Sequence, residues 1–292
     1  MKKKILVIGA GFLGSKILEI GNVTGYEVVG TSRIAQNNTI SLDISNIDEA
    51  ENLLRKINPD YVINCASRNE IDFLESHADL AMQVNSVGAR NVAKICSDNK
   101  VRLVHISTDS VFDGAKGWYS ENDKPNPLNI YSKSKYEGEL MVSSNINNYV
   151  IVRTNFYGVN KNGKYFFNWI LDNIKSNKTM TGFSDVIFSP LGITTLAKMI
   201  VELLEIKYNG ILHLSSGKTI SKFDFISKVV SFLGKSTSLV RQGRITDMKL
   251  PARRPLNTSL RNDLSKKLLK TEDMGLYDWL VQNSEEILKY LK

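Results

Sequence analysis

The feature that constrains the fold most is a glycine-rich turn near the start of the sequence. Residues 5–8 are all large and apolar, which suits a buried strand, and Gly9-Ala10-Gly11-Phe12-Leu13-Gly14 follows directly, before residues 15–20 with helical character. Glycines let a backbone turn tightly and approach a pyrophosphate, which the free N–H groups at a helix N-terminus attract. A tight turn without a ligand is the alternative. We expect a dinucleotide cofactor to contact Gly9, Gly11, Phe12, Leu13 and Gly14.

A second strand is expected at residues 27–31, and it ends in Ser32-Arg33. Proteins that bind NAD commonly offer a carboxylate here to the ribose 2′-hydroxyl, whereas a guanidinium suits a 2′-phosphate. Ser32 and Arg33 therefore predict NADP(H), with NAD(H) as the second option. Asp43 and Ile44 follow at the next expected strand end, where Asp43 either reaches the adenine edge or caps a helix over residues 47–57.

Strands and helices alternate through the first half of the chain. Residues 61–66 and 101–106 read as buried strands, with a long helical stretch over about 80–99 between them. This alternation predicts an α/β fold with a Rossmann-type, doubly wound parallel sheet, whose ligands gather at the carboxyl ends of the strands. Cys65, Ala66 and Ser67 would lie there, and so would Ser107 and Thr108.

Tyr131 and Lys135 form the candidate acid–base pair. If a helix begins just after Pro127, these two side chains lie four residues apart on one helical face. A phenol titrates near pH ~10, and an adjacent ammonium favours its ionised form. A hydroxyl at Thr108 could hold a carbonyl oxygen while Tyr131 gives it a proton. The alternatives are a solvated helix face for the pair and simple turn formation for Thr108.

Composition narrows the class of protein. The chain has 292 residues and a formal charge of +8, but its basic residues are dispersed, which suits surface charge or an anionic ligand and argues against nucleic acid. No segment approaches the ~20 apolar residues needed to span a bilayer, so we expect a cytoplasmic, soluble protein. Cys65 and Cys96 lack metal-type spacing, and the three histidines are isolated, so no metal site is predicted.

Several motifs together resemble the extended short-chain dehydrogenase/reductases. Besides the glycine turn and Tyr131-x-x-x-Lys135, the matching segments are residues 62–66, residues 84–93, Ser107-Thr108-Asp109-Ser110-Val111-Phe112-Asp113-Gly114, Arg153-Thr154 and residues 252–255. Within these proteins the chain is most similar to the dTDP-4-dehydrorhamnose reductase (RmlD-like) group. The similarity extends through nearly the whole chain.

The resemblance implies roles for individual residues. Thr108 would orient a carbonyl, Tyr131 would donate a proton, and Lys135 would lower the pKa of the tyrosine and bind the nicotinamide ribose. Asn85, with Cys65, Ala66 and Ser67, would lie along the cofactor. The substrate would be a nucleotide sugar with a 4-keto group, most simply dTDP-4-dehydrorhamnose, reduced by NADPH. It would contact Asp109, Val111, Arg153 and Arg254.

The chain is expected to form two interleaved parts. Residues 1–155, rejoined by about 183–215, would form the NADP-binding Rossmann domain. Residues 156–182 and 216–292 would form a smaller substrate-binding lobe. Arg254 either clamps a substrate diphosphate or is surface charge. A closing helix over 284–291 has an apolar stripe, which packs either on the lobe or on a second copy in a homodimer.

The chain departs from the resembling group near the expected sugar site. Ser110 replaces an aromatic residue, residues 153–158 lack the usual Trp, and residues 185–190 carry apolar residues where Gln and Gly are usual. A related epimerase or dehydratase is one alternative, although Ser110 stands where a dehydratase has an acid. A non-catalytic NADP-binding regulatory subunit, similar to the methionine adenosyltransferase β subunit, is another.

Overall fold

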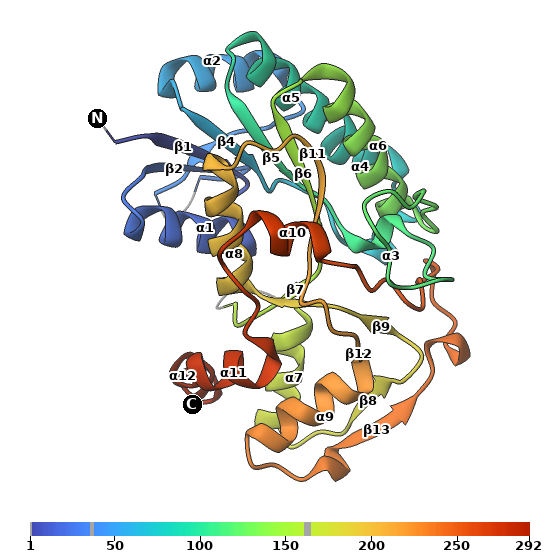
Figure 1. The fold of residues 1–292 in the computed structure, drawn as a ribbon. Coiled ribbons are helices and arrows are strands. Elements are labelled where there is room, and N and C mark those ends of the chain that lie inside the picture. The colour runs from blue at the N-terminus through green and yellow to red at the C-terminus, as the bar shows by residue number, and fades with distance from the viewer. Residues whose placement is uncertain (1, 36–37, 161–164) are drawn as a thin grey trace.

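A seven-stranded parallel sheet forms the larger part of the molecule (Figure 1). The computed structural model describes residues 2–35, 38–160 and 165–292. The strand order is β11-β6-β5-β4-β1-β2-β3, and all neighbouring pairs are parallel. The strands are β1 Lys4–Ile8, β2 Glu27–Ser32, β3 Ile40–Ser41, β4 Tyr61–Asn64, β5 Arg102–Ile106, β6 Tyr149–Thr154 and β11 Gly210–Leu214. The order reverses between β1 and β4, as the expected doubly wound fold requires.

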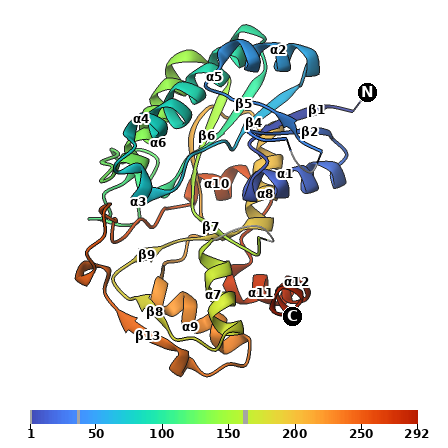
Figure 2. The same ribbon diagram turned by 180° about the vertical axis from the view of Figure 1, so that it is seen from behind.

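Helices cover both faces of this sheet (Figures 1 and 2). Alternate residues of β1 enter two different apolar cores, Ile5 and Val7 on one face and Leu6 and Ile8 on the other. This explains the continuous apolar run, because both faces of the strand are buried. The flanking helices are α1 Phe12–Val23, α2 Ile47–Ile57, α3 Ile71–Leu74, α4 Ala78–Met82, α5 Ala89–Asp98, α6 Ile130–Asn145 and α8 Ile193–Glu202.

The long helix expected over about 80–99 is interrupted. A π-helical turn, Gln83–Gly88, separates α4 from α5 and packs against α6. A Cβ added at Gly138 of α6 would lie 2.2 Å from the carbonyl oxygen of Asn85, so only glycine permits this approach. The π-turn directs Asn85 inward, where its side-chain amide bonds to Arg68 and Ser134. Widened turns of this kind often occur at functional sites.

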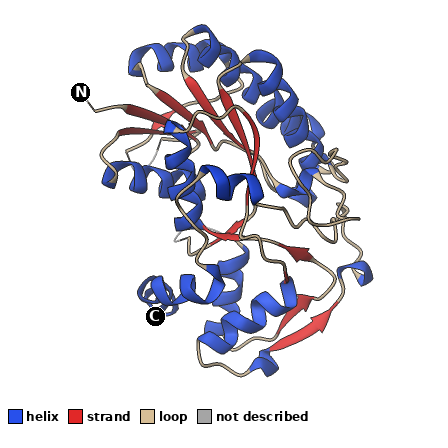
Figure 3. Cartoon of the chain, in the orientation of Figure 1, coloured by secondary structure: helices blue, strands red, loops and turns tan. Residues whose placement is uncertain are grey.

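The smaller lobe, built from short strands and helices, lies below the sheet in Figure 3. Its aromatic core includes Tyr157, Phe167, Phe225 and Trp279. Its closing helix packs on α7, where the Tyr290 hydroxyl donates to Asp172 at 2.9 Å. The elements are β7 Phe156–Tyr157, α7 Phe166–Lys175, β8 Met180–Phe183, β9 Ile187–Phe188, β10 Leu191–Gly192, β12 Ile220–Ser221, α9 Lys222–Phe232, β13 Val240–Gly243, α11 Gly275–Gln282 and α12 Ser284–Leu291.

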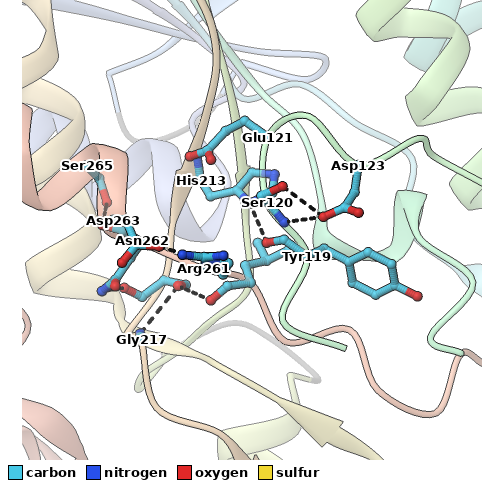
Figure 4. A network of polar contacts seen from close by, with 12 residues as sticks. Tyr119, Ser120, Glu121, Asp123, His213, Gly217, Arg261, Asn262, Asp263 and Ser265 are labelled. Carbon is cyan, nitrogen blue, oxygen red and sulfur yellow. Dashed lines mark hydrogen bonds and ion pairs between the residues drawn. The ribbon is translucent and has the colours of Figure 1, made fainter. Parts of the chain in front are cut away.

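The C-terminal part of the chain returns to the sheet before it completes the lobe. Helix α10, Asp263–Leu268, packs on β11 although it falls in the range expected for the lobe, and that boundary was wrong there. Figure 4 shows the polar contacts that precede it. The backbone of Arg261 donates to the carbonyl of Tyr119 at 2.8 Å, and the ring of His213 bonds to the same carbonyl at 3.1 Å. This segment therefore ties the two parts together.

Short 3-10 turns complete the secondary structure. They are η2 Asp109–Val111, η3 Leu203–Glu205, η4 Thr237–Leu239 and η5 Ile245–Asp247. Among the helices of residues 2–35, 38–160 and 165–292, none combines the length and the apolar character that crossing a bilayer demands.

Candidate active site

A cavity of about 410 Å³ opens at the carboxyl edge of the sheet, beside the point where the strand order reverses. This is where an open α/β sheet binds its ligand. The cavity brings together most residues that the sequence predicted for the cofactor. Those lining it are Gly9, Gly11, Phe12, Leu13, Gly14, Ser32, Arg33, Asp43, Ile44, Cys65, Ala66, Ser67, Tyr131 and Lys135.

The glycine turn forms one wall of this cavity. Gly9 has φ +86°, and a Cβ there would lie 2.6 Å from the backbone nitrogen of Ala66, while one on Gly14 would lie 2.2 Å from the Gly9 carbonyl oxygen. Gly11 has nothing within 4 Å of an added Cβ, and it precedes α1 without any side-chain cap. The first N–H groups of α1 are therefore available to an anion such as a pyrophosphate.

The far end of the cavity carries Arg33 and Asp43. Arg33 is exposed, and no carboxylate in the described part of the chain forms an ion pair with its guanidinium. The capping role considered for Asp43 was wrong, because Asn46 caps α2 by accepting from the backbone of Glu49. Asp43 instead accepts from the backbone and hydroxyl of Ser45, at 2.9 and 2.6 Å.

Helix α6 presents Tyr131 and Lys135 to the inner end of the cavity. Asn129 caps the helix by accepting from the backbone of Ser132, so the helix begins at Ile130, close to the expected start. The side chain of Lys135 is only 2 % exposed, and its Nζ donates to the carbonyl oxygen of Ile106 at 2.7 Å. Burial lowers the pKa of Lys135 to about 8, although the charge of Glu139 opposes this shift.

The electrostatics of Tyr131 differ from the expectation. Burial raises the pKa of Tyr131 to about 12, a hydrogen bond with Thr108 opposes the shift, and Lys135 is not among the groups that act on it. The expected effect of Lys135 on the pKa of this phenol is not seen in the protein without ligands, and it stays a prediction for the protein with cofactor bound. Tyr131 keeps its proton at neutral pH, which suits a proton donor.

The Asp109 carboxylate fixes the Thr108 hydroxyl by a hydrogen bond. The Asp109 carboxylate is buried and accepts from the Thr108 hydroxyl at 3.2 Å, from Thr258 at 2.6 Å and from the amide of Asn155 at 3.0 Å. Burial raises the pKa of Asp109, and these hydrogen bonds oppose the rise. The carboxylate thus links the end of β5 to the start of the lobe and to the C-terminal segment.

Three of the residues predicted to bind substrate, Asp109, Val111 and Arg153, are buried in the protein without ligands, so their contact with a substrate stays a prediction. Val111 is 0 % exposed and packs with Phe112 in a small apolar cluster. Arg153 is 1 % exposed, forms an ion pair with Glu139 at 2.6 Å and lies over the ring of Phe112. Val111 and Arg153 are thus packed in the interior, although the Nη1 atom of Arg153 has no hydrogen-bond partner in the described part of the chain.

Arg254 remains near the surface. Its guanidinium donates to Asp72 at 2.8 Å and to the carbonyl oxygen of Ala252 at 2.9 Å. These bonds fix the side chain against helix α3, and it does not line the cavity at the sheet edge. Its role as a diphosphate ligand stays a prediction.

Asn85 lies beneath the cavity wall and does not line it. Its amide oxygen accepts from the Ser67 hydroxyl at 3.1 Å and from the backbone of Arg68 at 2.8 Å. It therefore shapes the loop after β4, which lines the cavity. The geometry favours this indirect role over the predicted direct contact of Asn85 with the cofactor.

Sequence reasoning missed Glu139. It lies one helical turn after Lys135 on the same face of α6, where its carboxylate accepts from the Ser107 hydroxyl as well as from Arg153. Because Lys135 and Glu139 are four residues apart in an expected helix, the sequence alone could have indicated that the two side chains lie on one face. The cavity lining also includes Arg68 and Glu70 from the loop after β4, together with Phe156 and Tyr165 from the start of the lobe, and no sequence pattern joins these two segments.

The fold and the site together define a two-part Rossmann-type protein of the extended short-chain dehydrogenase/reductase type, with Tyr131 and Lys135 lining the cavity and Thr108 hydrogen-bonded to Tyr131. The chain belongs to the family described as the RmlD substrate binding domain, whose model matches residues 2–283.

Individual relatives support this assignment. The chain is 30% identical over 265 residues to the probable low-salt glycan biosynthesis reductase Agl14 of Haloferax volcanii, covering 87% of this chain and 88% of that protein. It is 28% identical over 248 residues to the dTDP-4-dehydrorhamnose reductase of Salmonella typhimurium, covering 81% and 82%. Among solved structures, the dTDP-4-dehydrorhamnose reductase of Bacillus anthracis in complex with NADP has a TM-score of 0.89 and 30% identity, covering 98% of this chain and 100% of that one.

Proposed function

We propose that this protein uses NADPH to reduce the 4-keto group of a nucleotide sugar, with dTDP-4-dehydrorhamnose as the first substrate to test. The observation that carries the proposal is the arrangement at the end of β5, where Thr108 contacts the protonated Tyr131 beside the cofactor-sized cavity. The reductases among the relatives support the same reaction.

The residues of the cavity fit a dinucleotide. Gly9 and Gly14 leave no room for side chains, so the backbone and the uncapped start of α1 can contact a pyrophosphate closely. The guanidinium of Arg33, which forms no ion pair with the residues that the structure describes, suits a ribose 2′-phosphate and so favours NADP(H). Lys135 and Tyr131 line the inner end, where the nicotinamide riboside would lie.

The side chains of the site supply the proton chemistry. A bound NADPH supplies the hydride that goes to the ketone carbon. The Tyr131 hydroxyl donates its proton to the ketone oxygen, and the Thr108 hydroxyl orients that oxygen by a hydrogen bond. Lys135, one turn away, is positively charged when protonated and stabilises the phenolate that remains. A proton from solvent then restores the phenol, and the product is a secondary alcohol.

The reaction is tested with purified protein, NADPH and a panel of 4-keto nucleotide sugars that differ in sugar and base. We expect NADPH to be consumed with at least one sugar and the alcohol to be found by mass spectrometry. Tight cofactor binding without turnover on the whole panel would contradict the proposal and favour a regulatory role.

Cofactor choice is tested separately by comparing KM for NADPH and NADH. Arg33 has no competing carboxylate, so we expect the lower KM for NADPH. Equal or better use of NADH would contradict the role given to Arg33.

A further inference from the structure

Lys222 is a charged side chain for which the reaction described above has no role. It is the first residue of α9, in the lobe, and is partly buried. Its Nζ lies 3.5 Å from the ring centroid of Phe188 and 4.1 Å from that of Phe166. Throughout the part of the chain that the structure covers, no carboxylate comes close enough to form an ion pair with it.

This environment is unusual for a lysine. An ammonium group removed from water normally requires a charged partner, and Lys side chains are rarely buried without one. Two aromatic faces stabilise the cation in part. Burial nevertheless lowers the pKa of Lys222 to about 7, and the charge of Asp109 opposes that shift. The amine is therefore held in place, but its capacity to donate hydrogen bonds is largely unused.

The position of Lys222 connects it to the catalytic residues. Strand β12, which ends just before Lys222, pairs with β9 so that Ile220 lies opposite Phe188. Next to Phe188, the carbonyl of Ile187 accepts from the backbone of Thr258 at 3.0 Å. Thr258 in turn bonds to the carboxylate of Asp109, which holds Thr108. The charges of Lys222 and Asp109 act on each other, so the amine lies near the carboxylate that holds Thr108.

The charge of Asp109 decides which part of a substrate suits Lys222. A diphosphate carries negative charge and would be repelled by the Asp109 carboxylate. A sugar hydroxyl is neutral, and its oxygen can accept a hydrogen bond from the ammonium group. The sugar must also lie close to Thr108 and Tyr131 for its ketone to be reduced, which places its neighbouring hydroxyls at this end.

We propose that Lys222, held between Phe166 and Phe188, donates a hydrogen bond to a sugar hydroxyl next to the reacting ketone and so determines which sugar is accepted. This rests on the proposed function. Phe188, one of the two rings, belongs to residues 185–190, where the chain departs from the resembling group.

The test compares Lys222→Met, which keeps the length and removes the charge, with Lys222→Arg, which keeps a cation. For the sugar that the wild-type protein reduces, we expect Lys222→Met to raise KM by about tenfold or more, the value of one charge-assisted hydrogen bond, and Lys222→Arg to restore part of the loss. The KM for NADPH and the unfolding midpoint should not change. Lys228→Met on the exposed face of the same helix is the matched control and should behave as wild type.

A second measurement separates the sugar from the diphosphate. Calorimetric binding of the nucleoside diphosphate without sugar, to protein loaded with NADP⁺, should be the same for wild type and Lys222→Met. An equal loss for this ligand would overturn the proposal and assign the amine to the diphosphate. An unchanged KM for the sugar, or a parallel loss of NADPH binding and stability, would also overturn it. If the wild-type protein reduces no sugar, the proposed function fails instead.

Discussion

Lys135 at the sheet edge and Lys222 in the lobe are both buried amines with lowered pKa values, but their surroundings differ. Lys135 donates to the carbonyl of Ile106 and is close to Glu139, so it has polar partners before any ligand binds. Lys222 lies over two aromatic rings, and only the charge of Asp109 counters the effect of its burial. If the proposed function holds, the difference means that the sheet edge is preorganised for a constant cofactor, whereas the amine in the lobe gains its polar partner from the sugar.

The largest expected effect concerns the sheet edge. Tyr131→Phe removes the proton donor but keeps the ring, so kcat should fall by about 10²–10⁴-fold while NADPH still binds. Steady-state kinetics and calorimetric titration with NADPH measure the two quantities. A variant that kept most of its turnover would remove Tyr131 from the mechanism, and with it the contrast between a catalytic edge and a selective lobe.

Glu139→Ala tests whether the sheet edge depends on its buried polar network. The change leaves the Arg153 guanidinium in the interior without its partner, so the free energy of unfolding should fall by about 3–5 kcal/mol. Urea unfolding measures this. Glu51→Ala, at an exposed helical pair with Arg55, is the control and should cost less than about 0.5 kcal/mol. Equal costs for the two variants would show that the buried network contributes little.

Phe225→Ala tests the lobe, because this ring packs in its aromatic core. A cavity there should cost about 3–5 kcal/mol of unfolding free energy. Since Phe225 also contacts Phe166 and Phe188, KM for the sugar should rise more than KM for NADPH. An equal rise in both constants would contradict the separation of cofactor and sugar between the two parts.

Acid should destabilise the part that carries the sheet, where His105 and His213 are buried. Burial lowers the pKa of His213 to about 3, below its ordinary value of 6.5, so the folded protein binds this proton less tightly than the unfolded chain. The stability that the neutral, buried His213 contributes is fully present above pH 6.5. As the pH falls from 6.5 towards 3, about 1.4 kcal/mol is lost for each unit.

Urea midpoints measured between pH 7 and pH 5 test this prediction. His213→Gln should reduce the pH dependence, because one buried group that must lose its proton on folding is gone. A dependence as steep as that of the wild type would assign the acid sensitivity to other groups.

The cofactor side of the site was readable from the sequence because its signals are local. Gly9, Gly11 and Gly14 lie within one turn, and Tyr131 and Lys135 are separated by one helical turn, so spacing alone brings each set together. Helices α2 and α12 likewise begin and end where the apolar pattern predicted. The π-turn that directs Asn85 inward was missed, because only its packing against α6 reveals it.

The substrate side was predicted less well because it depends on which distant residues meet. Arg153 matched a motif, but the direction of its side chain was fixed by Glu139 on another element. Val111 was placed in an apolar cluster by the turn after β5. In both cases the sequence identified the segment, and only the tertiary structure shows that these side chains are buried in the protein without ligands.

The sequence by itself determined the parallel sheet, the glycine turn and the spacing of Tyr131 and Lys135, because strand burial and helical periodicity act over a few residues. Only the tertiary structure decided that Tyr131 keeps its proton, that Asp109 holds Thr108, and that Lys222 lies between two rings. These features depend on burial and on charges from residues far apart in the chain, and a pKa is set by that surrounding medium.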